Sequence, residues 1–216
     1  FIAGVLKSWM EGGELFSDAG IVYRSNAQSR ALEEALLRVN IPYRIYGGLR
    51  FYERMEIKNA MSYLKVIFNP HDNPAFERSI ANPTRGIGVK SQAKIRDTAK
   101  AYNLSYIKAA AKLHDEGKMG GKAGQGLNAY LALITECIGL LDTMPLSELM
   151  DMIIQKSGLY HYHKKEAGEK GKTRIENLEE LVTSAKNFEQ SFESEKSHKE
   201  IAEIFLDTVS LDSGDT

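Results

Sequence analysis

The stretch IVYRSNAQSRALEEALLRVNIPYRIYGGLRFYERMEIK, residues 21–58, decides the fold that the sequence predicts. Two short runs in it, residues 21–23 and 43–46, consist largely of β-branched and aromatic residues, which favour strands. Between them, apolar residues recur at the spacing of an amphipathic helix: Ala31, Leu32, Ala35, Leu36 and Val39. The stretch therefore predicts a strand, a helix and a second strand in that order.

A polar corner precedes the predicted helix. Ser25 is a suitable N-cap, and Gln28 three residues later completes a capping box. Arg24 and Asn26 then lie where the first strand ends and the helix begins. The free N–H groups and the partial positive charge of a helix start suit a phosphate. On spacing alone, an ordinary strand–turn–helix with a capped start is the preferred interpretation.

The identity of the residues, beyond their spacing, points to one family. The segments that carry the resemblance are residues 23–30, 32–34, 42–48, 51–54, 56–58, 83–88 and 174–181. In these segments the chain strongly resembles the UvrD/Rep/PcrA group of superfamily 1 DNA helicases, and the resemblance extends over most of the chain. It implies that the opening stretch joins the end of subdomain 2A to the inserted, mostly helical subdomain 2B.

The resemblance therefore predicts a mainly α fold in two parts. Residues 1–43 are expected to form a partial α/β piece similar to subdomain 2A, and residues 44–216 a helical subdomain similar to 2B with helix–turn–helix elements that contact the DNA backbone. The chain opens inside an apolar pattern without an initiator Met, so we interpret it as a fragment of a longer protein.

The resemblance also implies an activity for the parent protein. Members of the family hydrolyse ATP with Mg²⁺ to move 3′-to-5′ along single-stranded DNA and unwind the duplex ahead, in DNA repair and replication. Their Walker motifs and later helicase motifs do not occur in this sequence, so we expect no catalytic, cofactor-binding or metal-binding residue and no ATP hydrolysis by the fragment alone. The implied partners are single-stranded DNA, duplex at a junction, and repair proteins.

Residues 84–88, TRGIG, form the second informative stretch and link two predicted helices. The two glycines leave the backbone bare, so a phosphate can approach its N–H groups, with Lys90 close by. A tight turn that needs glycine at positive φ explains the same letters, and the residues alone leave both interpretations open. The resemblance favours contact with a duplex backbone. The candidate DNA-binding residues are Arg24, Asn26, Lys58, Thr84, Arg85, Gly86, Ile87, Gly88 and Lys90.

Two other patterns imitate functional motifs. Residues 168–173, GEKGKT, resemble a phosphate-binding P-loop, but Glu166 stands where the first glycine is required and no buried strand precedes it. Thr173 and Glu176 instead predict a capping box for a helix over 173–188. His161 and His163 lack a third metal ligand, so solvated histidines beside a basic loop are the preferred interpretation.

Composition sets the remaining limits. Hydrophobic residues make up 43% of the chain and charged residues 26%, an ordinary globular composition. The sequence has no long apolar run and no signal peptide, so we expect no membrane role. The single Cys137 fits a cytoplasmic home.

The charges are unevenly distributed. Residues 84–100 carry five basic residues against Asp97, whereas residues 189–216 carry eight acidic residues against two lysines. The asymmetry fits a nucleic-acid face with an acidic region away from it, and solvated helix faces fit equally well. Two functions therefore remain open for the fragment: duplex binding at a junction, or an autoregulatory or protein-interaction module with little direct DNA contact.

Overall fold

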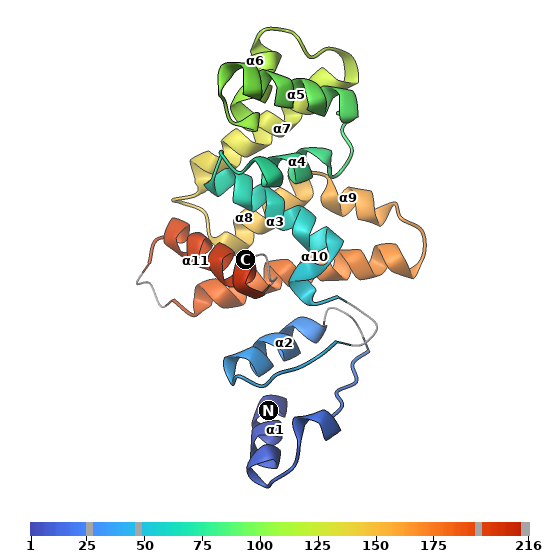
Figure 1. The fold of residues 1–216 in the computed structure, drawn as a ribbon, viewed down its shortest axis with the longest axis vertical. Coiled ribbons are helices and arrows are strands. Elements are labelled where there is room, and N and C mark those ends of the chain that lie inside the picture. Colours follow the sequence, from blue (N-terminus) through green and yellow to red (C-terminus); the bar gives the residue numbers. More distant parts are fainter. Residues whose placement is uncertain (25–27, 46–48, 193–195, 213–216) are drawn as a thin grey trace. The chain divides into compact units, whose positions relative to one another are not determined.

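The computed structural model describes residues 1–24, 28–45, 49–192 and 196–212, the side chains of Leu211 and Asp212 excepted (Figure 1). This described part is mainly α-helical, as the sequence predicts. The chain forms two compact units, Phe1–Arg54 and Met55–Thr216. The expected boundary after residue 43 lies inside the first unit, and the assignment of the two parts to subdomains 2A and 2B stays a prediction.

The first unit is small and helical. Its elements are α1 (Ile2–Glu11), the 3₁₀ turn η1 (Phe16–Asp18), α2 (Ser29–Arg38) and the 3₁₀ turn η3 (Phe51–Glu53). Its core is a cluster of Ala3, Leu6, Leu36 and Ile41, with partly buried residues of the connecting segments packed against it.

The two predicted strands are absent from the described residues of this unit. Residues 21–23 and 43–45 have no regular secondary structure, and residue 46 lies outside the described part. A strand exists only where its N–H and C=O groups pair with a neighbouring strand. Here Ile21 and Tyr43 pack against the α1–α2 cluster instead, and the described residues do not show the expected α/β piece.

Helix α2 begins at Ser29, later than the predicted capping box requires. Its N-cap is Gln28, whose side chain makes no cap; the Gln28 amide oxygen instead accepts a bond of 3.1 Å from the Arg24 N–H. Ser25 lies outside the described residues. The buried face of α2 is partly polar, because Ser29 accepts a hydrogen bond of 2.6 Å from the guanidinium of Arg54.

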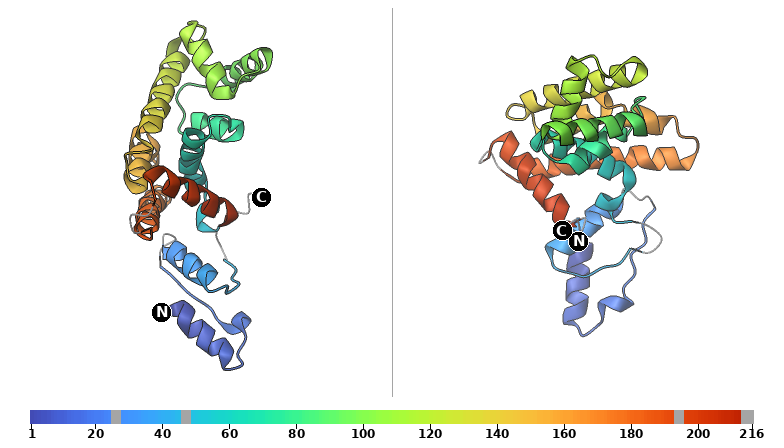
Figure 2. Two further views of the ribbon diagram at one scale, coloured as in Figure 1. Left: turned by 90° about the vertical axis from the view of Figure 1, so that its left-hand side faces the viewer. Right: turned by 45° about the horizontal axis from the view of Figure 1, so that its top comes forward.

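The second unit is built from helices alone in its described part. They are α3 (Met55–Phe68), α4 (Asn73–Ala81), α5 (Val89–Tyr102), α6 (Tyr106–Asp115), α7 (Gly121–Leu140), α8 (Leu146–Lys156), α9 (Leu159–Lys164), α10 (Glu169–Gln190) and α11 (His198–Asp212). Within this unit, α5 and α6 lie side by side at one end and α7 connects them to the rest (Figures 1 and 2).

Helix α3 is the centre of the second unit. It contacts α4, α7, α8, α10 and α11, and buried residues occur all round it rather than on one face. The small polar residues Asn59 and Ser62 take part in this burial, and the Ser62 hydroxyl donates to the backbone oxygen of Asn59 at 2.6 Å. A helix that is buried on every side must be covered by several partners.

Helix α10 begins at Glu169, so Thr173 is not its N-cap as the sequence predicts. Its N-cap is Gly168, and Gly171 is buried in the first turns. A Cβ at Gly171 would lie 2.4 Å from the backbone oxygen of Glu166, so only glycine permits this close packing. No described helix is long and apolar enough to cross a membrane.

Candidate nucleic-acid interface

The TRGIG turn connects the end of α4 to the start of α5. Thr84, Gly86 and Gly88 are exposed, and Ile87 is buried. Gly86 has φ +76°, so this position requires glycine, which agrees with the tight-turn interpretation that the sequence left open. Gly88 has φ −85°, which any residue adopts, so the requirement for positive φ does not extend to it.

The start of α5 is open to solvent. Gly88 is its N-cap, no side chain caps this end, and a Cβ at Gly88 would meet no atom within 4 Å. The N–H groups of the first turn have no partner inside a helix. Lys90 is exposed beside them and forms no ion pair with any described residue. A phosphate could therefore reach both the N–H groups and the ammonium group.

Arg85 points into the protein rather than away from it. One terminal nitrogen, Nη1, donates to the backbone oxygens of Ser79 at 3.2 Å and Pro83 at 3.0 Å. The other, Nη2, donates to the Tyr63 hydroxyl and, at 2.7 Å, to the backbone oxygen of Ser157. These bonds join the turn to α3 and to the junction between α8 and α9.

Aromatic rings cover the same guanidinium. Its central carbon lies 5.5 Å from the ring centroid of Tyr63 and 5.7 Å from that of Tyr130. Burial raises the pKa of Tyr63 to about 12, although Arg85 opposes the increase. Both phenols therefore stay neutral at physiological pH, since burial also raises the pKa of Tyr130.

The first turns of α7 lie directly against the TRGIG turn. A Cβ at Gly126 would lie 2.1 Å from the backbone oxygen of Arg85, and a Cβ at Gly86 would lie 2.9 Å from the Cβ of Lys122. The Lys94 ammonium group donates to the backbone oxygen of Lys118 at 2.7 Å, which ties α5 to the loop before α7. Exposed Lys122, which makes no ion pair with a described residue, thus stands beside the turn.

Lys58, from the same unit, does not lie at this turn. Lys58 is half-buried near the start of α3, whereas α3 reaches the turn through Tyr63, further along the helix. Arg24 is exposed in the first unit, beside the start of α2, and Asn26 lies outside the described residues. Contact of these residues with DNA stays a prediction.

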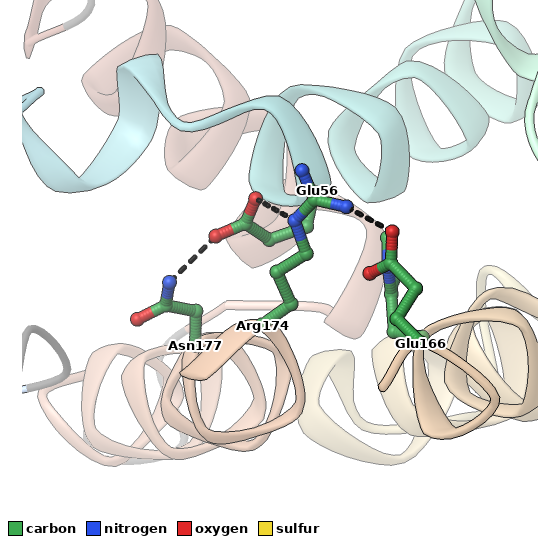
Figure 3. Close-up of polar contacts among 5 residues, drawn as sticks. Glu56, Glu166, Arg174 and Asn177 are labelled. Carbon is green, nitrogen blue, oxygen red and sulfur yellow. Dashed lines mark hydrogen bonds and ion pairs between the residues drawn. The ribbon is translucent and has the colours of Figure 1, made fainter. Parts of the chain in front are cut away.

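A partly buried polar cluster joins α3 to α10 elsewhere in the second unit (Figure 3). The Asn177 amide donates to the Glu56 carboxylate, and the Arg174 guanidinium lies 3.8 Å from the other Glu56 oxygen. Arg174 also donates to Glu166, so one cation stands between two carboxylates. Burial alone would raise the pKa of Glu166, but the bonds from His163 and Arg174 outweigh it and lower that pKa.

His163 is not solvated, contrary to the prediction from the sequence. Its ring is buried, and Nδ1 lies 2.8 Å from the Glu166 carboxylate. His161, by contrast, is exposed as predicted. No group of three or more His, Cys, Asp or Glu side chains in the described part could hold a metal ion. His163 is therefore part of this cluster, through its burial and its contact with Glu166.

Sequence reasoning missed Tyr63 and Ser157, which hold Arg85. Local periodicity could not find them, because the Arg85–Ser157 bond joins residues 72 positions apart. One signal was available: the run Asn59-Ala60-Met61-Ser62 has no charge, which is typical of a helix buried on all sides.

Comparisons with known proteins find one matching family and several similar proteins. Residues 1–119 match the family described as UvrD-like helicase C-terminal domain. The chain is 43% identical over 215 residues to DNA helicase II of Escherichia coli strain K12, covering 100% of this chain and 30% of that protein. It is 35% identical over 194 residues to the ATP-dependent DNA helicase PcrA of Bacillus subtilis strain 168, covering 89% of this chain and 26% of that protein. The chain thus spans less than a third of the length of these relatives.

Proposed function

Because the chain belongs to the family of UvrD-like helicase C-terminal domains, we propose that it is the duplex-contacting part of an ATP-dependent DNA helicase. ATP and Mg²⁺ would act in other parts of that protein, and single-stranded and duplex DNA would be its substrates. The motor chemistry requires a phosphate-cradling loop and a metal-binding carboxylate, and we assign no residue of this chain to either role.

The open start of α5 is the observation that supports this proposal most directly. Gly88 leaves room for a phosphate, the first-turn N–H groups face it, and Lys90 adds a full charge. Lys122 adds a second cation from a distant part of the sequence, next to Gly86. Contacts of this kind hold a duplex by its backbone and carry little sequence information.

The test is duplex binding by the protein that contains this chain, measured over a range of salt concentrations. Lys90→Gln should flatten the slope of log affinity against log salt by about one unit, the change expected for one lost phosphate contact. Lys122→Gln should do the same. Lys186→Gln is a matched control, because Lys186 is exposed near the far end of α10. Unchanged slopes for both Lys90→Gln and Lys122→Gln would contradict the proposal.

A second variant tests the access of a phosphate to the start of α5 without changing any charge. Gly88→Val removes no cation, its Cβ meets no atom within 4 Å, and the backbone conformation of this position suits valine. It should lower duplex affinity with little change of the salt slope and no loss of folding stability, because the side chain blocks the approach of a phosphate. If Gly88→Val and Lys90→Gln both retain full binding and unwinding, an autoregulatory or protein-interaction module becomes the better interpretation.

We propose a separate role for Arg24 in single-strand binding by the first unit. Its side chain is exposed beside the start of α2. Arg24→Gln should weaken binding of single-stranded DNA equally for every sequence, because a phosphate contact does not discriminate bases. Arg38→Gln, an exposed arginine in the last turn of the same helix, is the control. If the two variants bind single-stranded DNA with equal affinity, Arg24 does not contact the strand.

A further inference from the structure

The shape of the TRGIG turn depends on one side chain. Both terminal nitrogens of the Arg85 guanidinium are occupied by acceptors of the protein, three of which are backbone oxygens. A guanidinium has a fixed planar fork of donors, so it can hold such acceptors in one arrangement. The same group is covered by the Tyr63 and Tyr130 rings, which leaves its terminal nitrogens facing inward.

The partners of Arg85 outside the turn come from three helices and from the junction between α8 and α9. Tyr63 belongs to α3, Ser79 to α4 and Tyr130 to α7, while Ser157 precedes α9. The bonds therefore fix the turn relative to the centre of the second unit. They also fix the open start of α5, because its N-cap Gly88 is only three residues after Arg85.

We propose that Arg85 is a positioning residue for duplex binding and does not itself contact DNA. This rests on the proposed function, in which Gly86, Gly88, Lys90 and Lys122 form the phosphate-contacting surface. Arg85 keeps the first-turn N–H groups of α5 and the Lys122 side chain in the relative positions that a duplex backbone requires. Without these bonds the protein would keep the Lys90 and Lys122 charges, but the two cations would no longer be held in fixed relative positions.

Two substitutions of Arg85 separate positioning from direct contact. Arg85→Lys keeps the charge but cannot reproduce the planar fork. Positioning predicts that Arg85→Lys and Arg85→Gln both weaken duplex binding, roughly tenfold, with the salt slope unchanged. Direct contact predicts the opposite pattern: Arg85→Lys would retain most of the affinity, and Arg85→Gln would flatten the slope by about one unit.

A buried hydroxyl gives an independent test that does not alter any charge. Tyr63→Phe removes an acceptor of Arg85, and it also removes the donor that bonds the Asn82 backbone oxygen at 2.6 Å. Positioning predicts weaker duplex binding at unchanged salt slope, together with faster amide exchange in residues 84–90. Tyr130→Phe is the matched control, because its hydroxyl bonds Ser79, at 2.6 Å, and not Arg85. Tyr130→Phe should reduce thermal stability but leave the duplex affinity within twofold of wild type.

The outcomes distinguish this inference from the function on which it rests. If Lys90→Gln flattens the salt slope while Arg85→Lys and Tyr63→Phe bind DNA like wild type, Arg85 is not a positioning residue and the proposed function stands. If Arg85→Lys retains the duplex affinity that Arg85→Gln loses, Arg85 contacts phosphate directly. If Lys90→Gln and Lys122→Gln have no effect on duplex binding, both proposals fail.

Discussion

Gly126 on α7 lies directly beneath the backbone oxygen of Arg85, and a Cβ built at Gly126 would be 2.1 Å from that oxygen. This distance is far inside van der Waals contact, and the atom concerned is backbone, so the contact cannot be relieved by rotating a side chain. The crossing of the TRGIG turn over α7 therefore depends on a glycine at this position.

Gly126→Ala should destabilise the second unit by about 1–3 kcal/mol, because an extra methyl group in a packed contact forces the backbone to move. Gly139→Ala is the control on the same helix: a Cβ there meets nothing within 4 Å. The control should be neutral or stabilising, by about 0.5 kcal/mol, since alanine favours helix over glycine. Urea unfolding of both variants checks the prediction, and equal stabilities would show that α7 moves away without cost.

The cluster in Figure 3 predicts a strong dependence on Arg174. Removing this cation leaves Glu56, which is buried, and Glu166 without their shared partner. Arg174→Met should therefore destabilise the protein by about 3 kcal/mol, the cost typical of an uncompensated buried charge. Adding Glu56→Gln to that variant should recover part of the loss, because the remaining buried group is then neutral. A double-mutant cycle from denaturant unfolding measures this recovery, and strictly additive losses would contradict it.

Acid should weaken the same cluster through Glu166. Its pKa is lowered in the folded protein, so its contribution to stability is fully present above the unfolded pKa, near 4.5, and is lost as the pH falls through the folded value. Glu166→Gln should be less stable than wild type at pH 7, and the gap between them should narrow below about pH 4.5. Unfolding curves at several pH values test this. Glu203→Gln, at an exposed position on α11, should show no such convergence.

Cys137 should resist thiol reagents in the folded protein. Its side chain is fully buried on α7, and burial raises the pKa of the thiol to about 12. The thiolate is the reactive form, so only a minute fraction reacts at neutral pH. Mass spectrometry of the peptide that contains Cys137 should find little alkylation under native conditions and complete alkylation in denaturant. Rapid native labelling would mean that α7 opens locally.

Where a helix ends can be predicted from the sequence when the signal is local. Helix α3 (Met55–Phe68) ends where Asn69 precedes Pro70, because the residue before a proline disfavours helix. The residues 21–23 and 43–45 show the limit of such signals: their β-branched and aromatic content favours strands, but a strand also needs a neighbour.

The TRGIG turn could be located from the sequence, but the direction of the Arg85 side chain could not. The letters TRGIG identify an open turn, and Gly86 has the positive φ that a glycine turn suggests. The direction of the Arg85 side chain depends on Ser157 and Tyr63, which the fold brings from distant positions. The burial of His163 could not be predicted either, because it depends on how α9 packs. The charged residues next to it in the sequence favour exposure instead.

The central place of α3 has a consequence during protein synthesis. This helix is the first of the second unit to leave the ribosome, yet its later partners α7, α8, α10 and α11 follow one after another along the rest of the chain. At roughly 5–20 residues per second, its apolar surface waits on the order of ten seconds before α10 is complete. Hydrophobic surface exposed for that long is prone to aggregation. We expect chaperones to bind α3 in the nascent chain until the helices that bury it have been synthesised.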